Sequence, residues 1–237
     1  MDDNKAIIDL RSSKNIIEFL KAPTLKISEL LTGLIASDKS EYKLSAGHLV
    51  QAAIKCNLYE QLGREIKHYR DKGKIKEDFF STDKQRATLR EMLEFIDKDS
   101  PDEDRFKAMK SIFLRAISTE ATAEDEALAY ELMQIGKKLE SNDIIVLKAI
   151  YLLYKKIEAE NSPAKVANDG VQGWVTYVTK NSGHNVKELT LLSEQRLTDL
   201  KIISGRKYPD GSGMYNVETA RLTPLGLKLC EFITAYQ

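Results

Sequence analysis

Apolar residues recur at helical spacing along most of the chain, and short polar segments separate the runs. The longest run covers residues 45–72, where an apolar stripe of 3.6-residue period predicts a single helix. Shorter apolar runs over 16–20 and 25–35 precede it. Three further helices are predicted to begin after residues suited to an N-terminal cap: Ser81 or Thr82, Ser100, and Thr122. The first 140 residues therefore read as wholly helical.

The pattern changes near residue 141. A strongly apolar helix is predicted from Ser141 or Asn142, and the loop-like segment 161–170 follows it. We place the domain boundary between 140 and 141, so that residues 1–140 form a helical domain and 141–237 a second domain. A boundary near 162 is the alternative, because the apolar helix could serve both halves.

The second domain begins with two helices and a turn between them. Residues 171–180 predict a short helix, although their β-branched content leaves a strand open. Gly183 marks the turn. In the next helix we expect four leucines to face inward: Leu189, Leu192, Leu197 and Leu200. Its polar residues are then expected outward: Thr190, Ser193, Glu194, Gln195, Arg196 and Asp199.

A hairpin is predicted after this helix. Residues 201–204 read as a strand, 205–214 as a tip rich in turn residues, and 215–222 as the returning strand. Thr223 is then the expected cap of a final helix, with Pro224 in its first position. The order of helix, hairpin and helix predicts a winged helix-turn-helix domain, and the whole chain is predicted to be mainly α.

The run L-T-D-L-K-I-I-S, followed by V-E-T-A-R-L-T-P-L-G, resembles the recognition-helix end and wing of bacterial winged-helix proteins of the MarR and PadR types. The resemblance covers roughly 142–237 and implies that the second helix enters the major groove of double-stranded DNA. Two features depart from the pattern. Lys201 stands where such proteins usually carry a helix-ending glycine, and the expected outward face holds three acidic residues: Glu188, Glu194 and Asp199.

Five residues are the predicted nucleic-acid contacts under this resemblance. Gln195 could bond an adenine edge, and Arg196 a guanine edge or a phosphate. Arg206 and Lys207 lie on the hairpin tip, where winged domains commonly touch the sugar-phosphate backbone, and Lys187 begins the helix. We predict no catalytic, cofactor-binding or metal-ligating residues.

Charge limits the DNA hypothesis. The 237 residues contain 36 basic and 36 acidic side chains, so no global field draws the chain to nucleic acid and binding would need a local patch. No run approaches the length of a membrane span, and the N-terminus has no signal-type apolar stretch, so a cytoplasmic location without membrane contact is expected. Cys56 and Cys230 are expected to be buried thiols.

No catalytic or metal-binding spacing stands out. The three histidines are far apart, and the Arg64–His68 spacing is too short for the motif of HEPN-type ribonucleases. The acidic run 97–104 lacks the pattern of a calcium-binding loop and is expected to be a solvated helix start. Trp174 could stack a base, but we expect it in the core.

The leading hypothesis is therefore a DNA-associated regulatory or accessory protein of bacterial or mobile-element origin that binds through a winged helix. In this hypothesis the helical domain forms homo-oligomers or receives a partner. The alternative is a protein-interaction adaptor, for example an accessory component of a prokaryotic or phage-defence complex, with the winged helix as docking platform. A third hypothesis, an unrecognised nuclease, needs clustered carboxylates or a His–Arg pair in one cleft.

Overall fold

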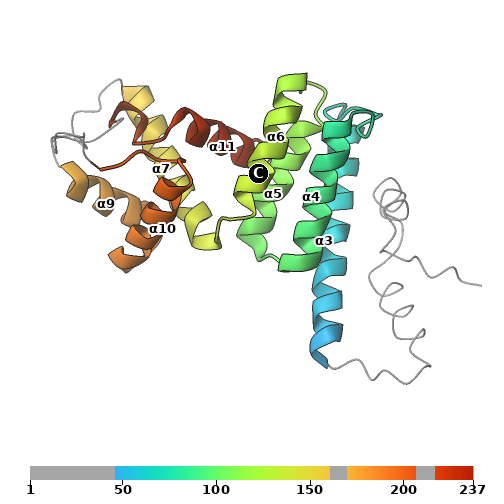
Figure 1. Cartoon of the computed structure of the whole chain (residues 1–237), viewed down its shortest axis with the longest axis horizontal. Coiled ribbons are helices and arrows are strands. Elements are labelled where there is room, and N and C mark those ends of the chain that lie inside the picture. Colours follow the sequence, from blue (N-terminus) through green and yellow to red (C-terminus); the bar gives the residue numbers. More distant parts are fainter. Residues whose placement is uncertain (1–45, 161–169, 207–216, 237) are drawn as a thin grey trace, which may run out of the picture. The chain divides into compact units, whose positions relative to one another are not determined.

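The computed structural model describes residues 46–160, 170–206 and 217–236, and Figure 1 traces them. This part of the chain is mainly helical and contains no β-strand, which confirms the predicted class. The predicted helices over 16–20 and 25–35 lie outside it. None of the helices described combines the length and the apolar character that a membrane span requires.

The chain packs as two compact units. Among the described residues, the first unit comprises 46–101 and 116–126, and the second comprises 102–115 and 127–236. Most of α5 (Glu103–Ala116) and of α6 (Ala123–Gly136) therefore belongs to the second unit. The domain boundary between 140 and 141 stays a prediction.

The first unit is built on an antiparallel helix pair, α3 (Ala46–Asp71) and α4 (Asp83–Asp99). The Tyr59 hydroxyl of α3 donates to the Leu93 carbonyl of α4 at 3.5 Å, and Lys55 bonds the carbonyl of Asp97 four residues further on. Burial, together with Asp97, raises the pKa of Tyr59. The expected stripe of α3 is buried here: Cys56, Tyr59, Leu62 and Ile66.

A buried carboxylate ties the start of α6 to the segment before α4. Glu126 is 5% exposed and accepts hydrogen bonds from Lys76 Nζ at 2.9 Å, the Thr82 hydroxyl at 2.8 Å and Gln85 Nε2 at 2.9 Å. Burial alone would raise the pKa of Glu126, but these donors outweigh burial and lower it. Thr82, one of the two predicted caps, also caps α4, through a reciprocal pair of bonds with Gln85.

The predicted cap at Ser100 is wrong. Ser100 ends α4 in the left-handed region, with φ 43°. Asp102 caps α5 instead: its carboxylate accepts from the Arg105 amide at 3.1 Å. The S-P-D sequence offers two residues of capping type, and only the chain direction after α4 decides between them.

Helix α7 (Ser141–Glu160) is central to the second unit and contacts α9 (Gly170–Asn181), α10 (Lys187–Asp199), the 3₁₀ turn η1 (Val217–Thr219) and α11 (Pro224–Thr234). These elements are labelled in Figure 1 except for the short η1 turn. Segment 170–181 is helical, which settles the helix–strand ambiguity. Gly183 has φ +74° in the turn that follows, a conformation that favours glycine.

The two predicted strands are not formed in the described residues. A single antiparallel bridge, Ile203 to Leu222, joins the segments, and the 3₁₀ turn η1 occupies part of the expected return strand. The tip over 207–216 lies outside the described residues. Ala220 and Arg221 have positive φ values of 51° and 74°, so the chain turns where the strand was expected.

The start of α11 lies in close backbone contact with residue 202. The Thr223 hydroxyl accepts from the Gly226 amide at 3.0 Å, which confirms the predicted cap, and Pro224 opens the helix. The Thr223 amide donates to the Ile202 carbonyl at 3.0 Å. A Cβ at Gly226 would lie 2.0 Å from that same oxygen. The glycine of L-T-P-L-G is thus required by a close backbone approach.

Candidate functional site

The face that α10 presents to solvent is the reverse of the expected one. Thr190 and Ser193 are fully buried and Glu194 is 4% exposed, whereas Leu189 is 42% and Leu192 55% exposed. The prediction that these two leucines face inward is therefore wrong, and so is the outward placement of the three polar residues. Four predictions for this helix are correct: Leu197 is buried, and Gln195, Arg196 and Asp199 are exposed.

Hydrogen bonds made by its polar side chains explain why α10 is rotated about its axis in this way. The Thr179 hydroxyl of α9 donates to the Thr190 hydroxyl at 3.0 Å, and the Asn142 amide of α7 bonds Ser193 Oγ at 2.6 Å and the Leu189 carbonyl at 3.0 Å. The inward polar groups of α10 therefore have partners, which removes the cost of burying them. Leucines fill the outward side as a consequence.

Arg196 is held by a buried carboxylate at the start of α7. Its Nε lies 3.0 and 2.9 Å from the two carboxylate oxygens of Asp143, which is fully buried. Asp143 Oδ2 also accepts from the Glu140 amide at 3.0 Å, so it caps its own helix as well. The Arg196 side chain remains 43% exposed, but its charge is compensated inside the protein.

Arg206 takes part in a second ion cluster. Glu194 Oε1 accepts from Arg206 Nε at 2.8 Å and from Arg221 at 2.6 Å, while Oε2 accepts from Arg206 at 2.6 Å. Arg221 is fully buried, donates twice to the Ser204 carbonyl and lies over the Trp174 ring at 4.4 Å. Burial alone would raise the pKa of Glu194, but the two guanidinium groups lower it.

The other predicted contact residues lie apart from these clusters. Lys187 and Gln195 are exposed on α10, and neither has a polar partner among the described residues. Lys207 lies outside the described residues. Trp174 is fully buried and donates to the Ala220 carbonyl at 3.1 Å, so it belongs to the core as expected.

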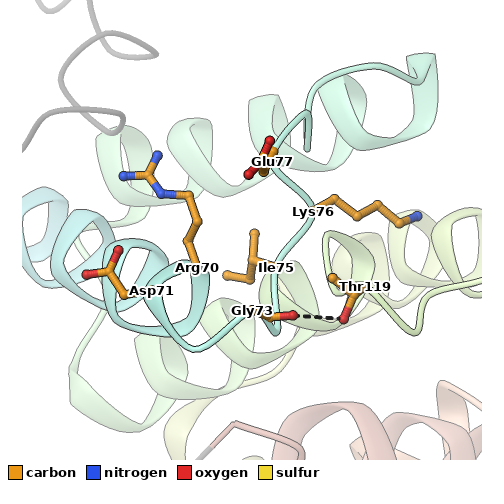
Figure 2. A pocket seen from close by; sticks show the side chains of 7 residues that line it. All are labelled: Arg70, Asp71, Gly73, Ile75, Lys76, Glu77 and Thr119. Carbon is orange, nitrogen blue, oxygen red and sulfur yellow. Dashed lines mark hydrogen bonds between the residues drawn. The ribbon is translucent and has the colours of Figure 1, made fainter.

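The first unit contains an open depression of about 590 Å³ near the end of α3. Figure 2 shows its seven lining residues, with the Thr119 hydroxyl bonded to the Gly73 carbonyl at 3.4 Å. The lining combines two cations, Arg70 and Lys76, with two carboxylates, and it includes no histidine or cysteine. The Lys76 ammonium is bonded to Glu126, outside the lining, and the lining residues form no recognisable catalytic arrangement.

Within 46–160, 170–206 and 217–236, no three histidine, cysteine, aspartate or glutamate side chains are grouped so that they could hold a metal ion. Cys56 and Cys230 are buried free thiols, as predicted, and burial raises the pKa of each. Comparison of the chain with protein-family models, curated proteins and solved structures found no match. Its function is therefore inferred from the geometry of the described residues.

Proposed function

We propose that the chain is a protein-interaction adaptor whose second unit docks a partner through the outward face of α10. The observation that carries this proposal is the exposure of Leu189 and Leu192 on α10, together with that of Leu191 on the same helix and of Val186 at its N-cap. Exposed apolar groups that lie side by side mark interaction surfaces more often than scattered single ones do. Among the side chains of α3 whose exposure the structure describes, Ile54 is the one large apolar side chain that is exposed.

The ion pairs of the two arginines support the same proposal. In a DNA complex, Arg196 and Arg206 would either leave Asp143 and Glu194, which are both buried, or offer a phosphate only their remaining N–H groups. A buried carboxylate that loses its partner is costly, so each exchange would offset the gain from the phosphate. A protein partner of the leucine face requires neither exchange.

We also propose that residues 170–236 have a winged helix-turn-helix arrangement. The order of α9, turn, α10, bridge and α11 supports it, as does the close approach of Gly226 to residue 202. In such an arrangement α10 corresponds to the recognition helix. Its leucines then take the place of the polar side chains that would read base edges.

The experiment compares co-purification of the tagged full chain from cells that naturally produce it. The Leu189→Asp/Leu192→Asp double variant should lose the specific partner, because charge at the centre of an apolar interface is strongly unfavourable. Leu152→Asp is the matched control, since Leu152 is 58% exposed on α7. Partner retention by the double variant, with Trp174 fluorescence unchanged, would contradict the proposal.

Association with double-stranded DNA is the second candidate function. The side chains of Arg196 and Arg206 remain 43% and 46% exposed, and Lys187 and Gln195 are exposed elsewhere on α10. A mobility-shift assay at two salt concentrations separates the two functions. DNA binding is supported by a shift at low salt that Lys187→Ala/Gln195→Ala weakens, whereas the adaptor proposal expects no shift.

A further inference from the structure

The outermost residues of α10 form a stripe with acidic ends. Glu188, Leu192, Gln195 and Asp199 follow the i, i+4, i+7, i+11 spacing of one helix face, and all four are exposed. The two carboxylates are eleven residues apart, about 16 Å along the axis at 1.5 Å per residue. We call these four residues the acidic stripe.

Neither carboxylate of the acidic stripe has a hydrogen-bond or ion-pair partner in the part of the chain that the structure describes. Neither of the exposed lysines nearest in sequence, Lys187 and Lys201, forms an ion pair with them in the described residues. Arg196 is compensated by Asp143, and Lys187 lies about 100° round the helix from Glu188, on the side of Leu191. Within the described residues, an apolar centre flanked by two carboxylates that have no ion-pair partner therefore remains.

We propose that the partner of the acidic stripe is a basic amphipathic helix. Its apolar face covers Leu189 and Leu192, and its lysine or arginine side chains pair with Glu188 and Asp199. Helices recognise apolar surfaces through residues spaced at i, i+3, i+4 and i+7, and flanking charges then set orientation and partner choice. This inference rests on the proposed docking function and adds the chemistry of the partner.

Charge also argues against the other occupants. Phosphate groups are repelled by Glu188 and Asp199, which lie on the surface that a groove would meet. If α10 of a second copy of the chain packed antiparallel against α10 of the first, Glu188 of one helix would lie opposite Asp199 of the other. Like charges opposite each other oppose that pairing. A basic amphipathic helix would cover the exposed leucines and also pair with both carboxylates.

The test uses a fluorescent synthetic helical peptide with leucines at i, i+3, i+4 and i+7 and flanking lysines, titrated with the full-length protein. We expect saturable binding that Leu192→Asp abolishes. Glu188→Gln/Asp199→Asn should weaken binding about tenfold, because each partly exposed ion pair contributes modestly. The matched control, Glu131→Gln/Glu218→Gln, removes two exposed carboxylates elsewhere in the second unit and should leave binding unchanged.

Salt and a charge-reversed peptide complete the test. At about 1 M salt the screening length falls from about 10 Å to about 3 Å, so the difference between wild type and Glu188→Gln/Asp199→Asn should shrink. Equal binding of a peptide with glutamates in place of lysines overturns the inference. So does an undiminished affinity of Glu188→Gln/Asp199→Asn.

The two proposals fail in different ways. If Leu189→Asp/Leu192→Asp loses the cellular partner but wild type does not bind the basic peptide, the basic-helix inference is overturned and the adaptor proposal stands. If Leu192→Asp binds both peptide and partner like wild type, the α10 face is not a docking surface and the adaptor proposal fails. Formation of an α10-dependent homodimer that excludes the peptide also overturns the inference.

Discussion

Removal of the Glu194 carboxylate should destabilise the second unit strongly. Glu194 is 4% exposed and its Oε1 lies 2.6 Å from the Arg221 guanidinium, which is fully buried. In Glu194→Ala the Arg221 charge stays in the interior with only the Ser204 carbonyl as hydrogen-bond acceptor. Breaking a buried ion pair on one side typically costs about 3–5 kcal/mol of unfolding free energy.

The other arginine of the cluster supplies the matched control. Arg206 donates two hydrogen bonds to the same carboxylate, but its side chain is 46% exposed. Arg206→Ala should therefore cost at most about 1 kcal/mol, because solvent replaces much of what is lost. Both variants remove the Arg206–Glu194 ion pair, but only Glu194→Ala also leaves the buried Arg221 without its carboxylate, and this predicts the difference between them.

Trp174 makes the measurement specific. It is the only tryptophan of the chain, and it lies buried beside Arg221 in the second unit. Urea unfolding followed by its fluorescence should shift the Glu194→Ala midpoint down by about 1–5 M, at a slope of about 1–3 kcal/mol per M. Equal midpoints for Glu194→Ala and Arg206→Ala would refute the reasoning.

The same carboxylate predicts how stability depends on pH. The pKa of Glu194 in the folded protein is lowered from its ordinary value of 4.5. Its stabilising contribution is therefore complete above about pH 4.5, and it is lost as pH falls through the lower folded pKa. The difference in unfolding free energy between wild type and Glu194→Gln should shrink on acidification below about pH 4.5 and stay constant above it.

Two further predictions concern a close backbone approach and a helix cap. Gly226→Ala should lower the stability of the second unit by about 2–3 kcal/mol in Trp174-detected unfolding, because its Cβ would lie 2.0 Å from the Ile202 carbonyl oxygen; a loss below about 0.5 kcal/mol would contradict that approach. Thr82→Ala should cost about 1 kcal/mol in unfolding followed by circular dichroism, because it removes the cap of α4 and a donor to Glu126; Ser81→Ala, which keeps both, is its control.

Local features of the fold could be predicted from the sequence because their causes are local. Thr82 and Thr223 cap helices through amides three residues away, and Gly183 supplies the positive φ of the turn before α10. The same signals failed at Ser100, where two capping residues compete within three positions. At Ala220 and Arg221, left-handed conformations interrupt the expected strand in residues that rarely adopt them.

The face of α10 could not be predicted, because residues distant in sequence determine it. Leucines occur on more than one side of this helix, so periodicity alone leaves its rotation open. The deciding partners are Arg221, twenty-seven positions after Glu194, and Asn142, fifty-one before Ser193. From sequence alone, a polar side chain on a helix is predicted to face solvent unless a buried partner for it is known. A single sequence does not show which distant residue is that partner.

The same pairing that decides the rotation of α10 also bears on the choice between DNA and protein. Glu194 neutralises one predicted phosphate contact, Arg206, and its burial turns Leu192 toward solvent. Asp143 likewise compensates Arg196 where α7 meets α10. The hydrogen bonds and ion pairs of the interior therefore leave α10 with leucines between two carboxylates that are unpaired within the part of the chain that the structure describes. Such a surface favours a basic, apolar protein segment over a phosphate backbone.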